Sequence, residues 1–226
     1  MRASRWIVHS RRNPSAILLS VQLLGMLVYP FIEGTEAGRI AFGVFGITVL
    51  IVTTRMVRTT PGLTWVSAGI ALPAILLQIV QAFQPQPVLL AVSAGLEAVF
   101  YFYAAGSLIA YMMADRHATT DELFAAGATF TLIAWAFTWL YILLQALRPG
   151  SFGAAVNTEQ LRSWTELMYL SFALLSSTGI GDVIPLSPVT RAVAAIEMFV
   201  GVMYLAAVVS RLIGLTLLQA GERHDR

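Results

Sequence analysis

The sequence predicts an all-α membrane protein that crosses the bilayer several times. Hydrophobic residues make up 58% of the chain and charged residues only 12%, and the mean hydropathy is +0.76. Soluble domains usually carry about 25% charged residues, so the composition argues against a soluble fold. The hydrophobic residues are gathered into long runs separated by short polar breaks, which is typical of a polytopic membrane protein.

Six stretches are long enough to cross a bilayer, because a helix needs about 20 mostly apolar residues to span a hydrocarbon core of about 30 Å. They are residues 16–32, 39–54, 63–83, 88–114, 123–147 and 189–218. Glycine, proline and charged residues separate them. We therefore expect six transmembrane helices. Five is the alternative, if the first two stretches form a hairpin that does not cross.

The positions of the arginines predict the orientation of the chain. Arginine supplies all 14 basic residues. If the N-terminus is cytoplasmic, ten arginines fall on the cytoplasmic side, and the outer side holds only Arg39, Arg148, Arg162 and Arg191. Because positive charge is enriched in cytoplasmic loops, we expect a multi-pass protein of the cell (plasma or inner) membrane with both termini in the cytoplasm. The basic start is interpreted as a cytoplasmic segment, since no small-residue cleavage site follows it.

Several classes of site are disfavoured by what the chain lacks. It has no cysteine, which excludes disulfides and thiolate metal sites. His9, His117 and His224 are scattered without the spacing of metal ligands. The arginines lie at the edges of apolar runs and do not form a nucleic-acid footprint. Since no nucleophile–base pair or carboxylate pair lies in the apolar stretches, the sequence does not predict an enzyme.

The break between the last two stretches, residues 148–188, is longer than the others and is not uniformly polar. Residues 161–175 within it are apolar enough to enter the interior of a membrane protein but too short to cross it. We expect them to form a re-entrant helix, which is tolerated at membrane depth where protein or a watery cavity surrounds it. An interfacial helix is the alternative for this segment taken alone.

A glycine-containing loop follows this short helix and reads Ser-Thr-Gly-Ile-Gly-Asp over residues 177–182. Glycine in alternate positions permits backbone conformations closed to other residues, so successive carbonyl groups can point to one side. Four such strands around an axis would stack rings of oxygen atoms that replace the hydration shell of a monovalent cation. The expected ion-binding residues are Ser177, Thr178, Gly179, Ile180 and Gly181.

This arrangement resembles the potassium channel superfamily, whose filter reads Thr-Val-Gly-Tyr-Gly-Asp. The Tyr-Leu-Ser-Phe run at residues 169–172 is similar to the family's pore helix. Pro185 stands where the outer mouth of channels in this family often has proline. Gly201 lies 22 positions after Gly179, as the family's inner-helix hinge glycine does. The resemblance covers residues 123–218. It implies a homotetrameric potassium channel, because one chain supplies one filter strand, with potassium ions at the filter carbonyls as the permeant ligand and no cofactor.

Three departures from the family's filter bear on selectivity. Ser177 keeps the hydroxyl of the threonine it replaces, whereas Thr178 adds a hydroxyl that needs a partner. Ile180 lacks the tyrosine hydroxyl that helps to hold the filter at a fixed width. A weakly selective channel that also passes sodium is therefore one alternative. A non-conducting regulatory membrane subunit with a channel-like scaffold is another.

Supporting roles are expected for residues near the filter. Asp182 should lie just outside it, and our hypothesis is that Tyr169 donates a hydrogen bond to this carboxylate. The alternative is a solvated carboxylate that merely attracts cations. Gly201 is the candidate gating hinge, or else a point of close packing. Further along, Leu205, Val209 and Ile213 line a cavity or pack as in any helix.

Two acids lie inside apolar stretches, where an ionisable residue is a functional candidate. Glu197 is either neutral and hydrogen-bonded behind the pore helix or a residue that tunes conduction or proton sensitivity. Glu97 poses the same question, and its nearest possible partners along the chain are Ser93 and Tyr101.

The sequence thus predicts four parts: a basic cytoplasmic segment at 1–15, a four-helix membrane domain at 16–116, a pore domain at 117–220 and a cytoplasmic tail at 221–226. The fourth apolar stretch has no arginine, and steep voltage sensing requires several on one helix. We therefore expect no voltage sensor. The tail is too short to form a soluble ligand-binding domain, so the lipid bilayer and other copies of the chain are the expected partners.

Overall fold

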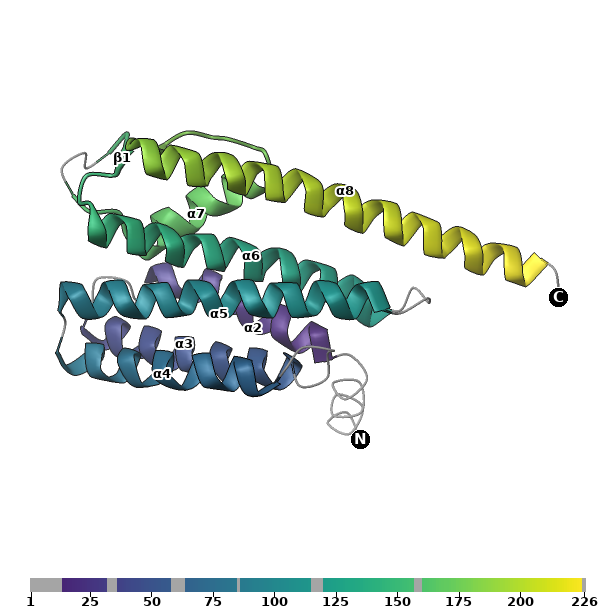
Figure 1. The fold of residues 1–226 in the computed structure, drawn as a ribbon, viewed down its shortest axis with the longest axis horizontal. Helices are drawn as coiled ribbons and strands as arrows, with labels where there is room; N and C mark the ends of the chain where they lie inside the picture. The colour runs from purple at the N-terminus through teal and green to yellow at the C-terminus, as the bar shows by residue number, and fades with distance from the viewer. Residues whose placement is uncertain are drawn as a thin grey trace.

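The computed structural model describes residues 14–31, 36–57, 64–84, 86–114, 120–156 and 160–224. Nearly all of them lie in helices that run side by side (Figure 1). The elements in chain order are α2 (Pro14–Val28), the 3-10 helix η1 (Tyr29–Phe31), α3 (Glu36–Val57), α4 (Thr64–Phe83), α5 (Pro87–Ala114), α6 (Thr120–Leu147), β1 (Phe152–Ala154), α7 (Trp164–Leu175), β2 (Val183–Pro185) and α8 (Pro188–His224).

The expected all-helical class is confirmed, and a helix stands at each of the six long apolar stretches and at the short one. Four segments are long and apolar enough to cross a membrane: Pro14–Phe31, Pro87–Met113, Thr120–Leu147 and Pro188–Arg211. Within the described side chains, the apolar parts of α3 and α4 are shorter, Val44–Arg55 and Trp65–Gln81. The structure thus supports a membrane protein with four such helices.

Most of the predicted N-terminal segment lies outside the described residues. This applies to its four arginines, to His9 and His117, and to the side chain of His224.

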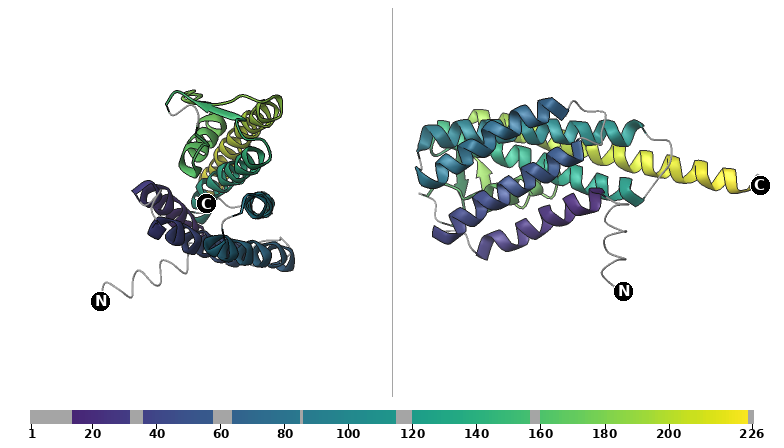
Figure 2. Two further views of the ribbon diagram at one scale, coloured as in Figure 1. Left: turned by 90° about the vertical axis from the view of Figure 1, so that its left-hand side faces the viewer. Right: turned by 90° about the horizontal axis from the view of Figure 1, so that it is seen from below.

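Helix α6 is the centre of the molecule. Helices α2 and α5 pack against it on one side, and α7 and α8 pack against it on the other. Figure 2 shows the α2–α5 group on one side of α6 and the C-terminal elements on the other. Most positions along α6 are buried, because its apolar residues are spread around the whole helix. It therefore joins helices α2–α5, the front helices, to the elements that carry the candidate site.

Two short strands were not expected from the sequence. β1 and β2 pair antiparallel, with Gly153 opposite Ile184. Each strand has only three residues, too few to show an alternating pattern. Their pairing brings the loop after α6 to the loop after α7, on the end of the molecule where α8 begins (Figure 1).

Helix α8 carries one packed stripe and one open face. Glu197, Gly201 and Tyr204 are buried against α6 and α7, and the Tyr204 hydroxyl donates to the Ala126 carbonyl at 2.7 Å. The spacing of these three residues places them on one side of the helix. On other sides large apolar side chains are exposed, and the helix runs beyond the bundle at its C-terminal end (Figure 1).

Candidate functional site: the filter-like loop and its supports

The short helix α7 begins with a complete capping box. The Ser163 hydroxyl accepts from the backbone amide of Glu166, and the Glu166 carboxylate accepts from the Ser163 amide at 2.7 Å. These bonds satisfy two donors that a helix start leaves free. The expected short helix at residues 161–175 is therefore present as Trp164–Leu175, and its sequence carries its own start signal.

Arg162 anchors the chain just before α7, a role that sequence reasoning missed. Its guanidinium is buried, donates to Glu166 Oε1 at 3.1 Å and also bonds the carbonyls of Gln160 and Val156. The side chain of Gln145, on α6, pairs with the backbone N–H and C=O of Arg162 at 2.9 Å each. The sequence suggested only an outer-loop charge, because the burial of Arg162 depends on how the loop folds back and on Gln145, which lies 17 residues away.

The loop after α7 is tied back to the last turn of that helix. The backbone amides of Thr178 and Gly179 both donate to the Ala173 carbonyl, at 2.9 and 3.0 Å, and the Ser177 amide donates to Leu174. The Thr178 hydroxyl lies 3.2 Å from the same Ala173 carbonyl and 2.6 Å from the Ser176 hydroxyl. The extra hydroxyl of Thr178 thus has partners on the pore-helix side of the loop.

Left-handed backbone alternates along the loop. Ser177, Gly179 and Gly181 have φ values of 60°, 58° and 80°. Glycine adopts this region without cost, whereas serine does so rarely. The sequence marked two of the three positions by their glycines, and Ser177 is the addition. This every-second-residue alternation is compatible with the sequence-based expectation that successive carbonyls face one side.

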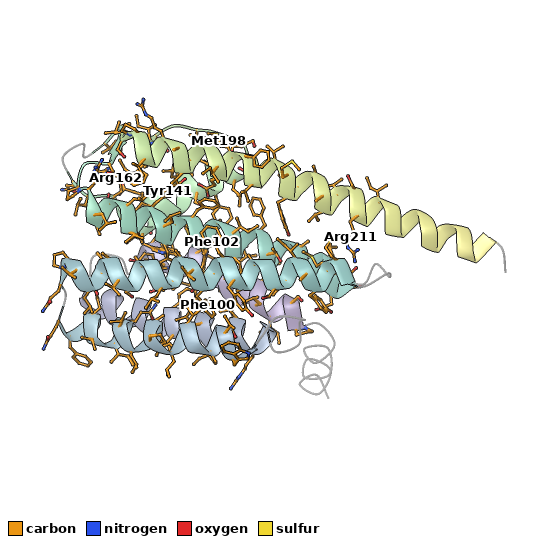
Figure 3. The ribbon with its side chains drawn as sticks, in the orientation of Figure 1. Phe100, Phe102, Tyr141, Arg162, Met198 and Arg211 are labelled. Carbon is orange, nitrogen blue, oxygen red and sulfur yellow. The ribbon has the colours of Figure 1, made fainter. Side chains whose placement is uncertain are left out.

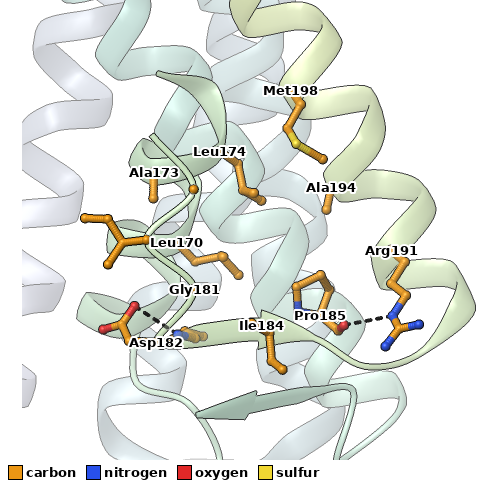
Figure 4. Close-up of a pocket in the computed structure, with 13 residues that line it drawn as sticks. Leu170, Ala173, Leu174, Gly181, Asp182, Ile184, Pro185, Arg191, Ala194 and Met198 are labelled. Carbon is orange, nitrogen blue, oxygen red and sulfur yellow. Dashed lines mark hydrogen bonds between the residues drawn. The ribbon is translucent and has the colours of Figure 1, made fainter. Parts of the chain in front are cut away.

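The side chains of the loop are open to the surroundings in a single chain. All residues from 176 to 182 are exposed, and Ile180 has 64% of its surface accessible. A cavity of about 350 Å³ borders the loop and is lined by Leu174, Ala194 and Met198 among others. Figure 4 shows the pore helix on one side of this cavity and α8 on the other. An apolar hollow of this size beside an exposed isoleucine is incomplete packing within one chain.

Asp182 lies at the end of the loop away from α7, and its hydrogen bonds differ from the hypothesis. Its Oδ1 accepts from the Val183 amide at 2.9 Å (Figure 4), and its carbonyl accepts from the Ala155 amide at 2.9 Å. Among the described residues, Tyr169 and Asp182 share no hydrogen bond, and Tyr169 is 39% exposed. The Asp182 carboxylate is itself exposed within one chain.

The outer end of the loop is held by the small sheet and by the start of α8. Strand β2 directly follows Asp182 and pairs with β1. The Arg191 guanidinium donates to the Pro185 carbonyl at 3.1 Å (Figure 4), and the Ser187 hydroxyl accepts from the Thr190 amide at 3.2 Å. Pro185 thus lies at the end of β2, close to α8, and the sheet gives the loop a second attachment besides α7.

Glu197 joins three helices behind the pore helix. It is fully buried on α8, and the hydroxyls of Tyr141 on α6 and Ser171 on α7 both bond its carboxyl oxygens. The Ser171 hydroxyl also lies 2.8 Å from the Ala134 carbonyl. A hydroxyl has one proton and here meets two acceptors, so a protonated Glu197 that donates to Ser171 satisfies every group. Figure 3 shows Tyr141 on α6 facing toward α7 and α8.

Gly201 lies directly against the end of α7. A Cβ built on it would overlap the backbone carbonyl group of Leu175 and lie only 2.9 Å from its Cα. Helix α8 continues without interruption through this position. The geometry thus agrees with close packing, which is one of the two roles that the sequence suggested for Gly201.

Residues expected to line an inner cavity share one side of α8. Leu205, Val209 and Ile213 follow at a spacing of four residues and are 40%, 52% and 56% exposed. Within the part of the chain that the structure describes, they form a partly exposed apolar strip.

The site just described coincides with a family match. Residues 128–217, from within α6 to within α8, match the sequence model of a family described as "Ion channel". No curated protein and no solved structure matches the chain. The matched segment contains the short helix, the alternating loop and the glycine-bearing helix after it. Residues 128–217, less than half of the chain, are therefore similar to an ion-channel family, and this match supports the resemblance of this part of the chain to the potassium channel superfamily.

Proposed function

We propose that the chain assembles as a homotetrameric channel that conducts potassium passively through the loop from Ser177 to Gly181. The observation that carries the proposal is the alternating left-handed backbone at Ser177, Gly179 and Gly181, tied to the end of α7 inside the segment that matches an ion-channel family. Carbonyl groups of such a loop can replace the hydration shell of a monovalent cation. An ion-channel family also points away from an enzyme.

Four copies are proposed because one loop supplies only one quarter of an ion-binding ring. The cavity beside the loop, the exposed Ile180 and the uncovered apolar surface of α8 support this assembly. Contiguous exposed apolar surface next to a family-matched domain is what an interface between copies would cover.

The proposed setting is the cell membrane with six crossings and both termini in the cytoplasm. Six long helices support it, although α3 and α4 have shorter described apolar parts than the other four. In this arrangement α2–α5 surround the pore domain. Helix α5 has no arginine along Pro87–Ala114 and Glu97 as its only charge, so opening is proposed not to depend strongly on voltage.

A weakly selective cation channel is the second candidate, and Ile180 favours it. The isoleucine side chain cannot form the hydrogen bond that a tyrosine at this place would form, so filter width is less constrained. Bi-ionic reversal potentials of the full chain in planar bilayers distinguish the two. Potassium selectivity predicts a large shift between potassium and sodium, whereas near-equal permeability would favour the second candidate. The Ile180→Tyr variant should raise the preference for potassium if loss of this constraint is the cause.

The test of conduction itself is a flux assay in liposomes. We expect thallium and potassium uptake by vesicles that contain the chain, with rubidium and sodium measured in parallel. Gly179→Ala is the matched loss-of-function variant, because open space surrounds the position but its φ of 58° strains any side chain. Absence of flux under every condition would support a non-conducting subunit instead.

A further inference from the structure

A buried acid lies in the front helices, away from the candidate pore. Glu97 is fully buried on α5, inside the segment Pro87–Met113 that is long and apolar enough to cross a membrane. Its Oε1 accepts from Gln78 Nε2 of α4 at 2.8 Å and from the Ser93 hydroxyl at 3.3 Å. Among the described residues Glu97 makes no ion pair. A buried negative charge is costly, so without an ion pair the charge of Glu97 must be neutralised in another way.

Among the described residues, the hydrogen bonds around Glu97 leave two acceptors without a donor. These are Glu97 Oε2 and Gln78 Oε1, both buried, and they belong to the two groups that the 2.8 Å bond already joins. The Gln78 carboxamide packs closely against α3 because residue 46 is a glycine. A Cβ on Gly46 would lie 2.8 Å from Gln78 Nε2. The carboxamide is thus held between α3 and α5.

A single proton supplies the missing donor. A carboxyl group protonated on Oε2 carries one O–H, which can donate to Gln78 Oε1 while Gln78 Nε2 donates to Oε1. The result is a two-bond acid–amide pair with no net charge. We propose that Glu97 and Gln78 form a proton-binding site in the front helices, with Glu97 held as a carboxylic acid.

No charged side chain that the structure describes faces this site from the neighbouring helices. Helix α4 has no charged residue, and Arg55 lies in the last turn of α3. On α6, Asp121 and Glu122 are in the first turn, whereas the part of α6 beside the site is its second half, where Leu143 contacts Gly95. On α5 itself the one titratable neighbour is Tyr101, one turn after Glu97.

Ring contacts lead from this site to the start of the pore helix. Tyr101 packs edge-on against Trp135 of α6, with ring centroids 5.7 Å apart, and Trp135 packs against Trp164 at 5.6 Å. Trp164 is the first residue of α7. Loss of the proton would leave a buried carboxylate one turn from Tyr101 and so disturb this packing. The consequence for the pore rests on the proposed function; the proton site does not.

The test is infrared spectroscopy of the full chain in lipid vesicles, with isotope-labelled glutamate, as a function of pH. We expect a protonated-carboxyl C=O band at neutral pH that weakens as the pH rises. Because Glu197 is also argued to be a protonated acid, it should contribute to the same band. Glu97→Gln should remove the Glu97 part of the band, and Glu197→Gln, the matched change at the other buried acid, should remove only its own part and leave the Glu97 part. Gln78→Leu should move the Glu97 part to higher frequency, because its hydrogen bond is lost.

Three results would overturn the inference. One is a wild-type spectrum with no protonated glutamate band at neutral pH, which requires no variant to fold. The second is a band that keeps its full wild-type intensity in Glu97→Gln, or one that disappears completely in Glu197→Gln. The third is a band at constant pH that falls as sodium replaces choline, since the site would then take sodium rather than a proton. If the chain conducts, the pH dependence of its conduction should change in Glu97→Gln. If the expected infrared band is found but no conduction is detected, the proton site stands and only the channel proposal is contradicted.

Discussion

At the scale of single residues, the structure makes Gly201 a packing position. The overlap of a built Cβ is with backbone atoms of Leu175, which cannot turn away as a flexible side chain would. The same helix offers a control at Gly214, where a built Cβ meets nothing within 4 Å. The two positions therefore separate local packing from the general effect of glycine in a helix.

We predict that Gly201→Ala lowers the stability of the chain by about 1–3 kcal/mol, the usual cost of overpacking. Gly214→Ala should be neutral or slightly stabilising, because alanine favours helix. Thermal unfolding of both purified variants in the same detergent checks this. Equal midpoints for Gly201→Ala and the wild type would mean that the end of α7 does not lie against α8 as described.

Glu197 allows a second prediction at this scale. Glutamine has the shape of a protonated glutamate and can accept from Tyr141 while donating to Ser171, so Glu197→Gln should retain near wild-type stability. Glu197→Leu leaves the buried Tyr141 hydroxyl without this acceptor and should cost about 1–3 kcal/mol. The measurement is again thermal unfolding. If glutamine destabilises as much as leucine, the charged carboxylate is required and the hydrogen-bond argument for a neutral acid is wrong.

At the scale of elements, the start of α6 connects the first helix to the last. Asp121 accepts from the Ser15 amide and hydroxyl at 3.1 and 2.9 Å, at the beginning of α2. Its neighbour Glu122 pairs with Arg211 of α8 at 2.9 Å, and both of these side chains are largely buried. Figure 3 shows Arg211 at the end of the bundle opposite Arg162. Adjacent acids on one turn thus hold α2 and α8.

A double-mutant cycle tests the link between α6 and α8. Glu122→Gln and Arg211→Gln should each destabilise the chain, and the double variant should lose less than their sum, with a coupling of about 0.5–3 kcal/mol. Thermal or denaturant unfolding in detergent gives the values. The control cycle combines Asp121→Asn with Arg211→Gln, which should be additive because Asp121 bonds Ser15 instead. Additivity in the first cycle would contradict a direct ion pair.

At the scale of the whole molecule, the open face of α8 bears on assembly. Met198, Phe199 and Val202 are 41%, 66% and 52% exposed. They lie on α8 away from the Glu197 stripe, and Met198 borders the cavity beside the filter-like loop (Figure 4). Contact with other copies of the chain would cover these side chains and complete the packing around the cavity beside the filter-like loop.

The absence of cysteine makes this prediction easy to check. In the proposed tetramer, Phe199→Cys should cross-link copies of the chain in membranes, because neighbouring inner helices approach one another around the axis. Leu72→Cys, equally exposed at 62% but on α4, should cross-link far less, since α4 lies in the front group. Native mass spectrometry gives the subunit number. A monomer in membranes, or equal cross-linking at both positions, would count against the proposed assembly.

Much of the candidate site could be predicted locally. The capping box at Ser163, the two glycines of the loop and the apolar helices all have short-range sequence signals. The pairing of Gln145 with the Arg162 backbone, the contact of Gly201 with Leu175 and the β1–β2 pairing had none, because each joins segments that are separated along the chain. The hydrogen bond expected from Tyr169 to Asp182 is not seen among the described residues, and Asp182 Oδ1 accepts from the neighbouring Val183 amide.

The sequence by itself indicated a helical membrane protein, because hydrophobic run length is read directly along the chain, and its loop motif carried the resemblance to an ion-channel family that the match over residues 128–217 supports. Only the tertiary structure decided that Ser177 shares the left-handed conformation of the glycines, that Glu197 bridges three helices and that Glu97 pairs with Gln78. Buried polar groups must find partners wherever packing brings them, and packing between distant helices leaves no periodic trace in the sequence.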